Sequence, residues 1–456
     1  MERFLNRRVF LKLGGLSVAL TVADAALARR LASGERRVED LPGRARRPAD
    51  QRSTPTLVTI FLRGGADGLN IVPPTESGEH ATYRSFRPGI GVPLTSMQSA
   101  GTVLTDSSGV EVGWGLNPRM DSLLPVWEAG SLAILPDVHY DNGSRSHFDS
   151  QQFYENGTPW NKFTPEGWAN RYLSATDGDP LLRAIAFDTI TPFAMSGSYP
   201  TLTFSGLGSL NVSSNTGRDQ RFLDTQEAAY PTLLDGPAVH DREVAQAGSD
   251  LVAAIRAIRA TTLPTPDPAV DALYPSTANG GVGPQGRHGY FGDRMRDLAS
   301  LIKSNAFSIE IAEVDLFSWD THNAQLTGAN NHPELCEALA RGLRAFHDDL
   351  GDFMDNVVVL VMSEFGRTAR ENGSGGTDHG SATTFFVMGP PTKVLGRRIV
   401  HGATGYRGLS DLRDNRDLKH STDYRSVIAE VLARHMGASS PDLFPGFEPV
   451  PVGVMA

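Results

Sequence analysis

Cysteine is almost absent from the chain, because Cys336 is the only one among 456 residues. A single cysteine forms no disulfide within the chain, so the folded core must supply the stability even in an oxidising compartment. Cys336 lies in Pro333–Leu339, a run with helical apolar periodicity, which predicts a packed side chain rather than a reactive thiol. No cysteine lies near the N-terminal apolar run, so we expect no lipid anchor.

An excess of positive charge and a long apolar run are also missing. The formal net charge is −10, which disfavours binding to nucleic acid. The apolar run Leu13–Ala28 contains Asp24 and is shorter than the roughly 20 residues that a spanning helix needs. We therefore expect no stable membrane anchor.

The N-terminus has the order of an export signal. Arg7 and Arg8 precede Phe10-Leu11-Lys12 as in a twin-arginine motif, and Ala26–Ala28 forms an A-x-A cleavage site. Cleavage there removes four basic and two acidic residues and changes the net charge from −10 to −12. We expect residues 1–28 to be a signal peptide for the twin-arginine translocase. The mature protein is then periplasmic or extracellular.

Residues 29–53 are crowded with Arg, Pro, Gly and Asp and predict a disordered linker. From residue 54 to 456, short apolar runs alternate with helical patterns, which predicts a single α/β domain. We expect a doubly wound, mostly parallel sheet with helices on both faces. The expected strands are 56–62, 132–136, 182–187, 309–314, 357–362 and 385–388. The expected helices are 241–260, 332–349 and 424–436, the last with Ser421 or Thr422 as its N-cap.

Carboxylates and imidazoles follow several of these strands, at the edge where open α/β sheets bind their ligands. An Asp-Gly pair alone is equally a turn signal, and Asp-x-His alone is a short motif. Their repeated position beyond strands predicts a metal site. The candidate ligands are Asp67, Asp320, His322, Glu364, Asp378 and His379.

Ser146 opens a helical run that follows the expected strand 132–136. A hydroxyl at a helix N-terminus lies in a partial positive charge and beside N–H groups that receive an anion. By itself the pattern favours an ordinary N-cap serine, the commonest role for a serine at that position. Arg145 and Arg367, and also Arg63, are candidates to bind anionic oxygens or to pair with a site carboxylate.

Five motifs together resemble the domain of unknown function 1501 family over about Thr56 to Met436. They are Phe61–Leu69, Ser146–Phe148, Trp319–His322, Ser363–Arg367 and Thr377–Gly380. Members of this family commonly carry twin-arginine signals, and the family resembles the alkaline phosphatase and sulfatase superfamily.

The resemblance implies a doubly wound sheet, Ser146 as nucleophile and two divalent metal ions. It implies Asp67 as the first-strand ligand, Asp320 and His322 in one metal site, and His379 with either Glu364 or Asp378 in the other. A serine stands where sulfatases carry a modified cysteine, which disfavours typical sulfatase chemistry. The mixed ligand set favours zinc, with manganese or calcium as alternatives.

The expected activity is hydrolysis of phosphate or sulfate esters, on a small molecule or attached to a polymer. One alternative is a non-catalytic exported binding protein with a degenerate or single-metal site. A further alternative is a carboxyl ester hydrolase in which His147 or His139 serves Ser146 as the base, although no Gly-x-Ser-x-Gly motif surrounds Ser146.

Overall fold

The computed structural model describes residues 8–13, 16–21, 54–176, 182–210, 220–221, 223–226, 228, 239–283 and 286–456. The expected linker 29–53 and most of the expected signal peptide lie outside these residues. The chain forms two compact units. Unit 1 comprises residues 1–54, 163–264 and 300–313, and unit 2 comprises residues 55–162, 265–299 and 314–456.

Unit 1 contains short strands and the long helix α9 (Val239–Ala260), which confirms the helix expected at 241–260. In it β7 pairs in parallel with β8, β8 pairs antiparallel with β2, and β2 pairs antiparallel with β1. The strand expected at 182–187 begins at residue 184, after Leu182 with its left-handed φ of 64°. The other elements are β1 (Arg8–Leu13), β2 (Leu16–Thr21), α7 (Trp168–Ala175), β7 (Ala184–Phe187), η4 (Phe193–Met195), β8 (Thr201–Phe204) and η5 (Leu207–Leu210).

Unit 2 is built on a sheet whose strands lie in the order β9-β3-β10-β11-β6-β12, with β13 also paired to β6. Every residue of β3 and β10 is buried, because both faces of the sheet are covered. The strands are β3 (Thr56–Leu62), β6 (Leu132–His139), β9 (Ile311–Leu316, which begins in unit 1), β10 (Val357–Met362), β11 (Thr383–Met388), β12 (Arg398–Ile399) and β13 (Thr422–Asp423). A separate hairpin pairs β4 (Val103–Thr105) with β5 (Glu111–Gly115).

The directions of these strands decide which loops meet. β10 pairs in parallel with β3, and β11 pairs antiparallel with both β10 and β6. The expectation of a parallel strand at 385–388 is therefore wrong, because a continuous apolar run reports burial on both faces and not direction. The segment before β11 comes to the same sheet edge as the segments that follow β3, β6 and β10.

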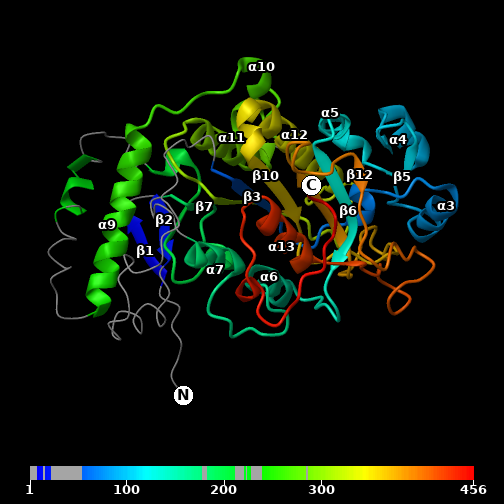
Figure 1. The fold of residues 1–456 in the computed structure, drawn as a ribbon. Coiled ribbons are helices and arrows are strands. Elements are labelled where there is room, and N and C mark those ends of the chain that lie inside the picture. The colour runs from blue at the N-terminus through cyan, green and yellow to red at the C-terminus, as the bar shows by residue number, and fades with distance from the viewer. Residues whose placement is uncertain are drawn as a thin grey trace. The chain divides into compact units, whose positions relative to one another are not determined.

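Helices cover both faces of this sheet, and the expected α/β class is confirmed. The helix α6 (His147–Asn156) packs on α13 (Tyr424–Arg434), where the rings of Tyr154 and Tyr424 stack with centroids 4.1 Å apart; Figure 1 shows both helices in front of the strands. Asp423 caps α13 with its side chain. The expected caps Ser421 and Thr422 are wrong, because the helix begins at Tyr424 and the residue directly before it is Asp423.

The other elements of unit 2 include α12 (His332–Leu350), which confirms the helix expected at 332–349. On it Cys336 is fully buried, and burial raises the pKa of its thiol well above the usual value. None of the helices in the described ranges has the length and apolar character needed to cross a membrane. The remaining elements are α2 (Gly68–Ile71), α3 (Ser77–Phe86), α4 (Leu94–Ala100), η3 (Pro118–Leu123), α5 (Leu124–Glu128), α10 (Pro268–Asp271), η6 (Thr277–Asn279), α11 (Gly289–Lys303, which ends in unit 1), η8 (Gly351–Asn356) and η9 (Pro441–Leu443).

Candidate functional site

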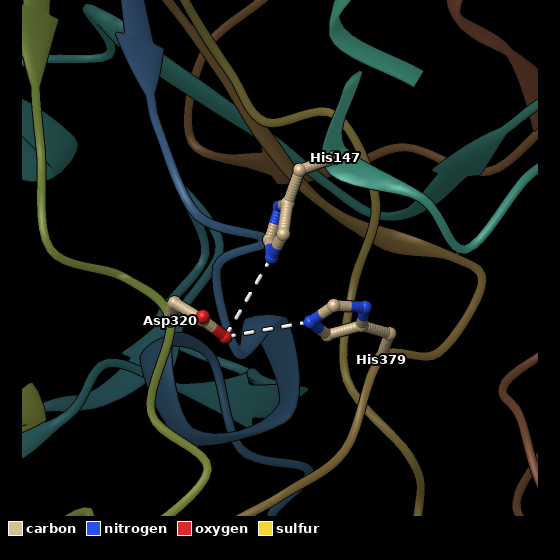
Figure 2. Close-up of side chains that lie close together, drawn as sticks. All are labelled: His147, Asp320 and His379. Atoms are coloured by element: carbon tan, nitrogen blue, oxygen red, sulfur yellow. Dashed lines mark ion pairs between the residues drawn. The ribbon is translucent and has the colours of Figure 1, made fainter. Parts of the chain in front are cut away.

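Three side chains from separate segments converge at this sheet edge. His147 is the first residue of α6, Asp320 follows β9, and His379 lies between β10 and β11. Figure 2 shows both imidazoles directed at the Asp320 carboxylate. One ligand atom from each of the three residues lies within 4.8 Å of the other two, the spacing of a metal site. Among the described residues this is the one such group of three or more His, Cys, Asp or Glu ligands.

The Asp320 carboxylate is the centre of the group. Its Oδ1 lies 3.6 Å from Nε2 of His147, 3.4 Å from Nε2 of His379 and 3.1 Å from Nε2 of His322. Arg367 Nη2 donates to the same oxygen at 2.6 Å. Burial disfavours the charged carboxylate, but the interactions with His147, His379 and Arg367 outweigh it and lower the pKa of Asp320 far below the usual value. The carboxylate is therefore ionised at any physiological pH.

The Nδ1 atom of each of these three imidazoles lies within hydrogen-bonding distance of an acceptor oxygen. His147 Nδ1 lies 2.9 Å from Glu364 Oε1, and His379 Nδ1 lies 2.7 Å from the Arg145 carbonyl oxygen. His322 Nδ1 lies 3.2 Å from Asp378 Oδ1. Carbonyl and carboxylate oxygens only accept, so Nδ1 of each ring carries the proton.

In the neutral form of each ring, the unprotonated Nε2 is then the atom that faces Asp320. The Nε2 atoms of His322 and His379 lie only 2.9 Å apart. Lone pairs and a carboxylate that face one another repel unless a proton or a metal cation lies among them. Imidazole nitrogens oriented by outer carboxylates and carbonyls are typical of protein metal sites. His147, Asp320 and His379 fit a divalent ion, and His322 lies at the edge of this ligand group.

Without metal the same arrangement favours protonation. Burial lowers the pKa of His147, but the bonds to Asp320 and Glu364 outweigh it and raise the pKa to about 9. A metal ion must displace that proton. We expect the affinity for zinc to increase about tenfold per pH unit between pH 6 and pH 8, because one proton is released on binding.

The stability of the metal-free protein should decrease as the pH rises, whereas the affinity for zinc increases. A raised pKa in the folded state stabilises the fold below the unfolded value of 6.5, and this contribution is lost as the pH rises toward 9. Thermal unfolding in EDTA across pH 6–9 measures this loss, and His147→Gln serves as the control without the titrating ring. For the zinc prediction, an affinity that does not change with pH would contradict His147 as a metal ligand.

Glu364 lies behind His147 rather than in the ligand group. It is fully buried, and its Oε1 accepts from Gly64 N, His147 Nδ1 and Gln151 Nε2 at 2.8–2.9 Å. Burial alone would raise the pKa of this carboxyl, but the bonds from His147 and Gln151 outweigh it and the pKa is lowered. The contacts of Glu364 therefore orient His147.

Asp378 is likewise outside the ligand group. Its half-exposed side chain pairs with His322. A hydrogen bond from Asn372 lowers its pKa, and so do His322 and the charge of Arg416. The ligand group combines His147 with Asp320 and His379, which the sequence placed in separate metal sites, while Glu364 and Asp378 contact the imidazoles of His147 and His322.

Asp67 is fully buried at the start of α2, away from the ligand group. Its Oδ2 accepts from Arg87 Nη1 at 2.7 Å and from Gln325 Nε2 at 2.6 Å. Arg87 also donates to the carbonyl oxygens of Thr368 and Ala369, in the segment that follows β10. These contacts make Asp67 part of a buried ion pair that ties two site segments together.

The contacts of Asp67 predict a stability effect rather than a metal effect for Asp67→Asn. The Arg87 side chain has no exposed surface, so the substitution leaves a buried charge uncompensated. We expect a loss of about 3 kcal/mol in the free energy of unfolding. Urea unfolding measures it, and the metal content per folded molecule should stay at the wild-type level. A stable variant that loses its metal would restore Asp67 as a ligand.

The two candidate arginines are already paired. Arg367 is buried and donates to Asp320, to Trp319 O at 3.2 Å and to Thr377 O at 3.0 Å, so it fixes the loops around the site. Arg145 Nε donates to Asp417 at 2.8 Å, and its Nη2 lies 3.1 Å from Asp414. Both arginines pair with carboxylates, which is one of the two roles that the sequence allows. Arg63 likewise pairs with Asp315 and Glu155.

Ser146 occupies the N-cap position of α6, between two residues that contact the ligand group. The Arg145 carbonyl binds His379, and His147 is itself a ligand candidate. The Ser146 side chain makes no capping hydrogen bond. The position expected from the sequence is confirmed, but the hydroxyl does not perform the capping role that was the alternative.

His147 is a site residue that the sequence does not place among the ligand candidates. It belongs to none of the Asp or His pairs that follow a strand, and the sequence suggests it only as a base for Ser146. The signal that identifies it is its position at the start of a helix that follows β6, whose end lies at the same sheet edge as the other segments.

The C-terminal part of the chain matches a known family model. Residues 305–443 match the model described as "Protein of unknown function (DUF1501)". The match covers less than a third of the chain. It contains Asp320, His322, Glu364, Arg367 and the Asp378-His379 pair. The matched region therefore supplies two members of the ligand group, and His147 comes from outside it. No curated protein matches the chain.

Solved structures with a similar chain path include two enzymes. The alkaline phosphatase from the Antarctic bacterium TAB5 has 10% sequence identity, with 74% of this chain and 92% of that chain covered and a TM-score of 0.28. The lipoteichoic acid synthase LtaP from Listeria monocytogenes has 10% identity, with 76% and 69% covered and a TM-score of 0.31. Similarities this distant leave the chemistry to be inferred from the residues of the site.

Proposed function

We propose that the protein is an exported, metal-dependent hydrolase of phosphate or sulfate esters with Ser146 as its nucleophile. The convergence of His147, Asp320 and His379, each ring backed by an acceptor, is the observation that carries the proposal. The neighbouring helix start adds a hydroxyl that is not used for capping. A cation site beside a nucleophile at a helix N-terminus suits an anionic ester.

His147, Asp320 and His379 would hold one divalent ion. Two imidazoles and one carboxylate suit zinc first and manganese second, whereas calcium prefers oxygen ligands. A bound divalent ion supplies stabilisation of the charge that develops on the ester oxygens and lowers the pKa of a coordinated hydroxyl.

The residues of the chain supply the other parts of the reaction. Ser146 Oγ releases its proton to solvent water and attacks the phosphorus or sulfur atom, so that a bond from Oγ to that atom forms as the bond to the leaving alcohol oxygen breaks. That oxygen takes up a proton. Water then attacks the seryl ester and releases phosphate or sulfate and the free serine. The first-turn N–H groups of α6 point toward the non-bridging oxygens of an ester held at its N-terminus.

An assay with three substrates tests the proposal. Purified protein is incubated with aryl phosphate, aryl sulfate and aryl acetate, with and without EDTA. We expect turnover of the phosphate or the sulfate that EDTA abolishes and added zinc or manganese restores. Turnover of aryl acetate alone, unaffected by EDTA, would support a serine esterase instead. Bound metal without turnover of any ester would support the exported binding protein.

A further inference from the structure

Three arginine side chains surround two aspartates beside the site. Arg145 Nε donates to Asp417 at 2.8 Å, and Arg416 Nη1 donates to the same carboxylate at 3.1 Å. Arg145 Nη2 lies 3.1 Å from Asp414 Oδ2, and Arg413 Nε lies 3.8 Å from the same oxygen. We call Arg145, Arg413 and Arg416 the arginine cluster. The reaction proposed above uses none of their guanidinium groups.

The charges of this cluster do not balance. Three guanidinium groups share the two carboxylates of Asp414 and Asp417, which leaves one positive charge in excess. This excess lies in a chain whose formal net charge is −10. The Asp417 side chain is fully buried and holds two of the arginines, while about a third of each of the three arginine side chains is exposed. The cluster thus presents fixed, partly exposed donors.

The backbone holds the cluster in place. Arg416 N and Asp417 N both donate to Arg413 O at 3.0 Å, which closes a tight loop. Ala369 N donates to Arg416 O at 2.9 Å, which joins this loop to the segment that contains the site residue Arg367. The guanidinium groups therefore start from a backbone that is fixed relative to the site.

The cluster is also adjacent to the proposed reaction centre. The carbonyl oxygen of Arg145 accepts from His379 Nδ1 at 2.7 Å, and Ser146 is the next residue in the chain. An anionic substrate bound at Ser146 would have this excess charge as its neighbour.

We propose that the arginine cluster is a subsite for a second anionic group on the same substrate molecule. This inference rests on the proposed function and specifies its substrate class: an ester that carries a further phosphate, sulfate or carboxylate, as in a bisphosphorylated sugar or an anionic polymer. A guanidinium binds such a group through two parallel hydrogen bonds, and the single excess charge matches one anionic group.

Equilibrium binding separates this subsite from turnover. In Ser146→Ala protein with metal bound, calorimetry compares glucose 1,6-bisphosphate with glucose 6-phosphate, which differ by one phosphate. We expect the bisphosphate to bind about tenfold more tightly, as is typical of one charge-assisted contact. Arg416→Gln and Arg413→Gln should each reduce that ratio toward one. Arg119→Gln, which removes an exposed arginine paired with Glu337, is the matched control and should keep it.

Dextran sulfate, compared with uncharged dextran, extends the test to polymers. The cluster predicts retention of dextran sulfate that weakens between 50 and 200 mM salt and is reduced in Arg416→Gln. Equal affinities for the two sugar phosphates together with no retention of dextran sulfate would overturn the subsite, as would a preference that survives both arginine substitutions. Absent turnover in the wild-type protein would instead overturn the proposed function and leave these binding ratios to decide the subsite.

Discussion

Ser146→Ala is expected to reduce ester turnover at least about a thousandfold, because the substitution removes the atom that forms the covalent intermediate. The metal content should stay at the wild-type level. The Ser146 hydroxyl makes no capping bond, so α6 loses no side-chain cap, and the three ligand candidates keep their contacts. Turnover and metal content are measured on the same preparation.

Ser144→Ala is the matched control for this substitution. The Ser144 hydroxyl accepts from Ser146 N at 3.1 Å, so its removal disturbs the same loop without removing the proposed nucleophile. We expect turnover within about tenfold of the wild-type rate, the size of a lost positioning hydrogen bond. Equal turnover in Ser146→Ala and wild-type protein would remove Ser146 as nucleophile, even if the metal site is present.

His379→Ala should abolish metal binding and turnover together. His379 supplies one of the three ligand atoms, and the Arg145 carbonyl fixes its Nε2 toward Asp320. Removal even of an outer partner of a metal ligand typically weakens metal affinity 10- to 100-fold, so loss of a ligand should cost about a hundredfold or more. Metal titration against a competing chelator measures the affinity.

His347→Ala controls for the loss of a histidine elsewhere. His347 lies on α12, pairs with Asp348 and has no contact with the ligand group. Its substitution should leave the metal affinity unchanged. An affinity in His379→Ala equal to that of the wild-type protein would show that the imidazole at this position is not a ligand.

The sequence predicted the strands better than their directions. The bounds of β3 and β10 match the expected 56–62 and 357–362, because fully buried strands are continuous apolar runs. The same run at β11 gave no information about direction, which depends on the partners at long range. The start of α13 at residue 424 was predicted, but its cap was not, because the side chain of Asp423 rather than that of Ser421 or Thr422 caps the helix.

The sequence predicted the sheet edge at which the candidate site lies, but only some of the residues in its ligand group. Asp320 and His379 could be found because acidic and His residues stand beyond apolar runs. The sequence could not show that Glu364 turns its carboxylate to His147, or that Asp67 is bound by Arg87. Such partners lie up to 217 residues apart, and only folding decides which carboxylate is a ligand and which one supports a ligand.

Metal analysis of the protein tests the central claim most directly. Wild-type protein, refolded or purified with zinc and manganese present, should contain about one equivalent of divalent metal after extensive dialysis. His147→Ala, Asp320→Ala and His379→Ala should each contain far less, while His347→Ala should match the wild type. Wild-type protein that retains no metal under these conditions would contradict the metal site and the hydrolase built on it.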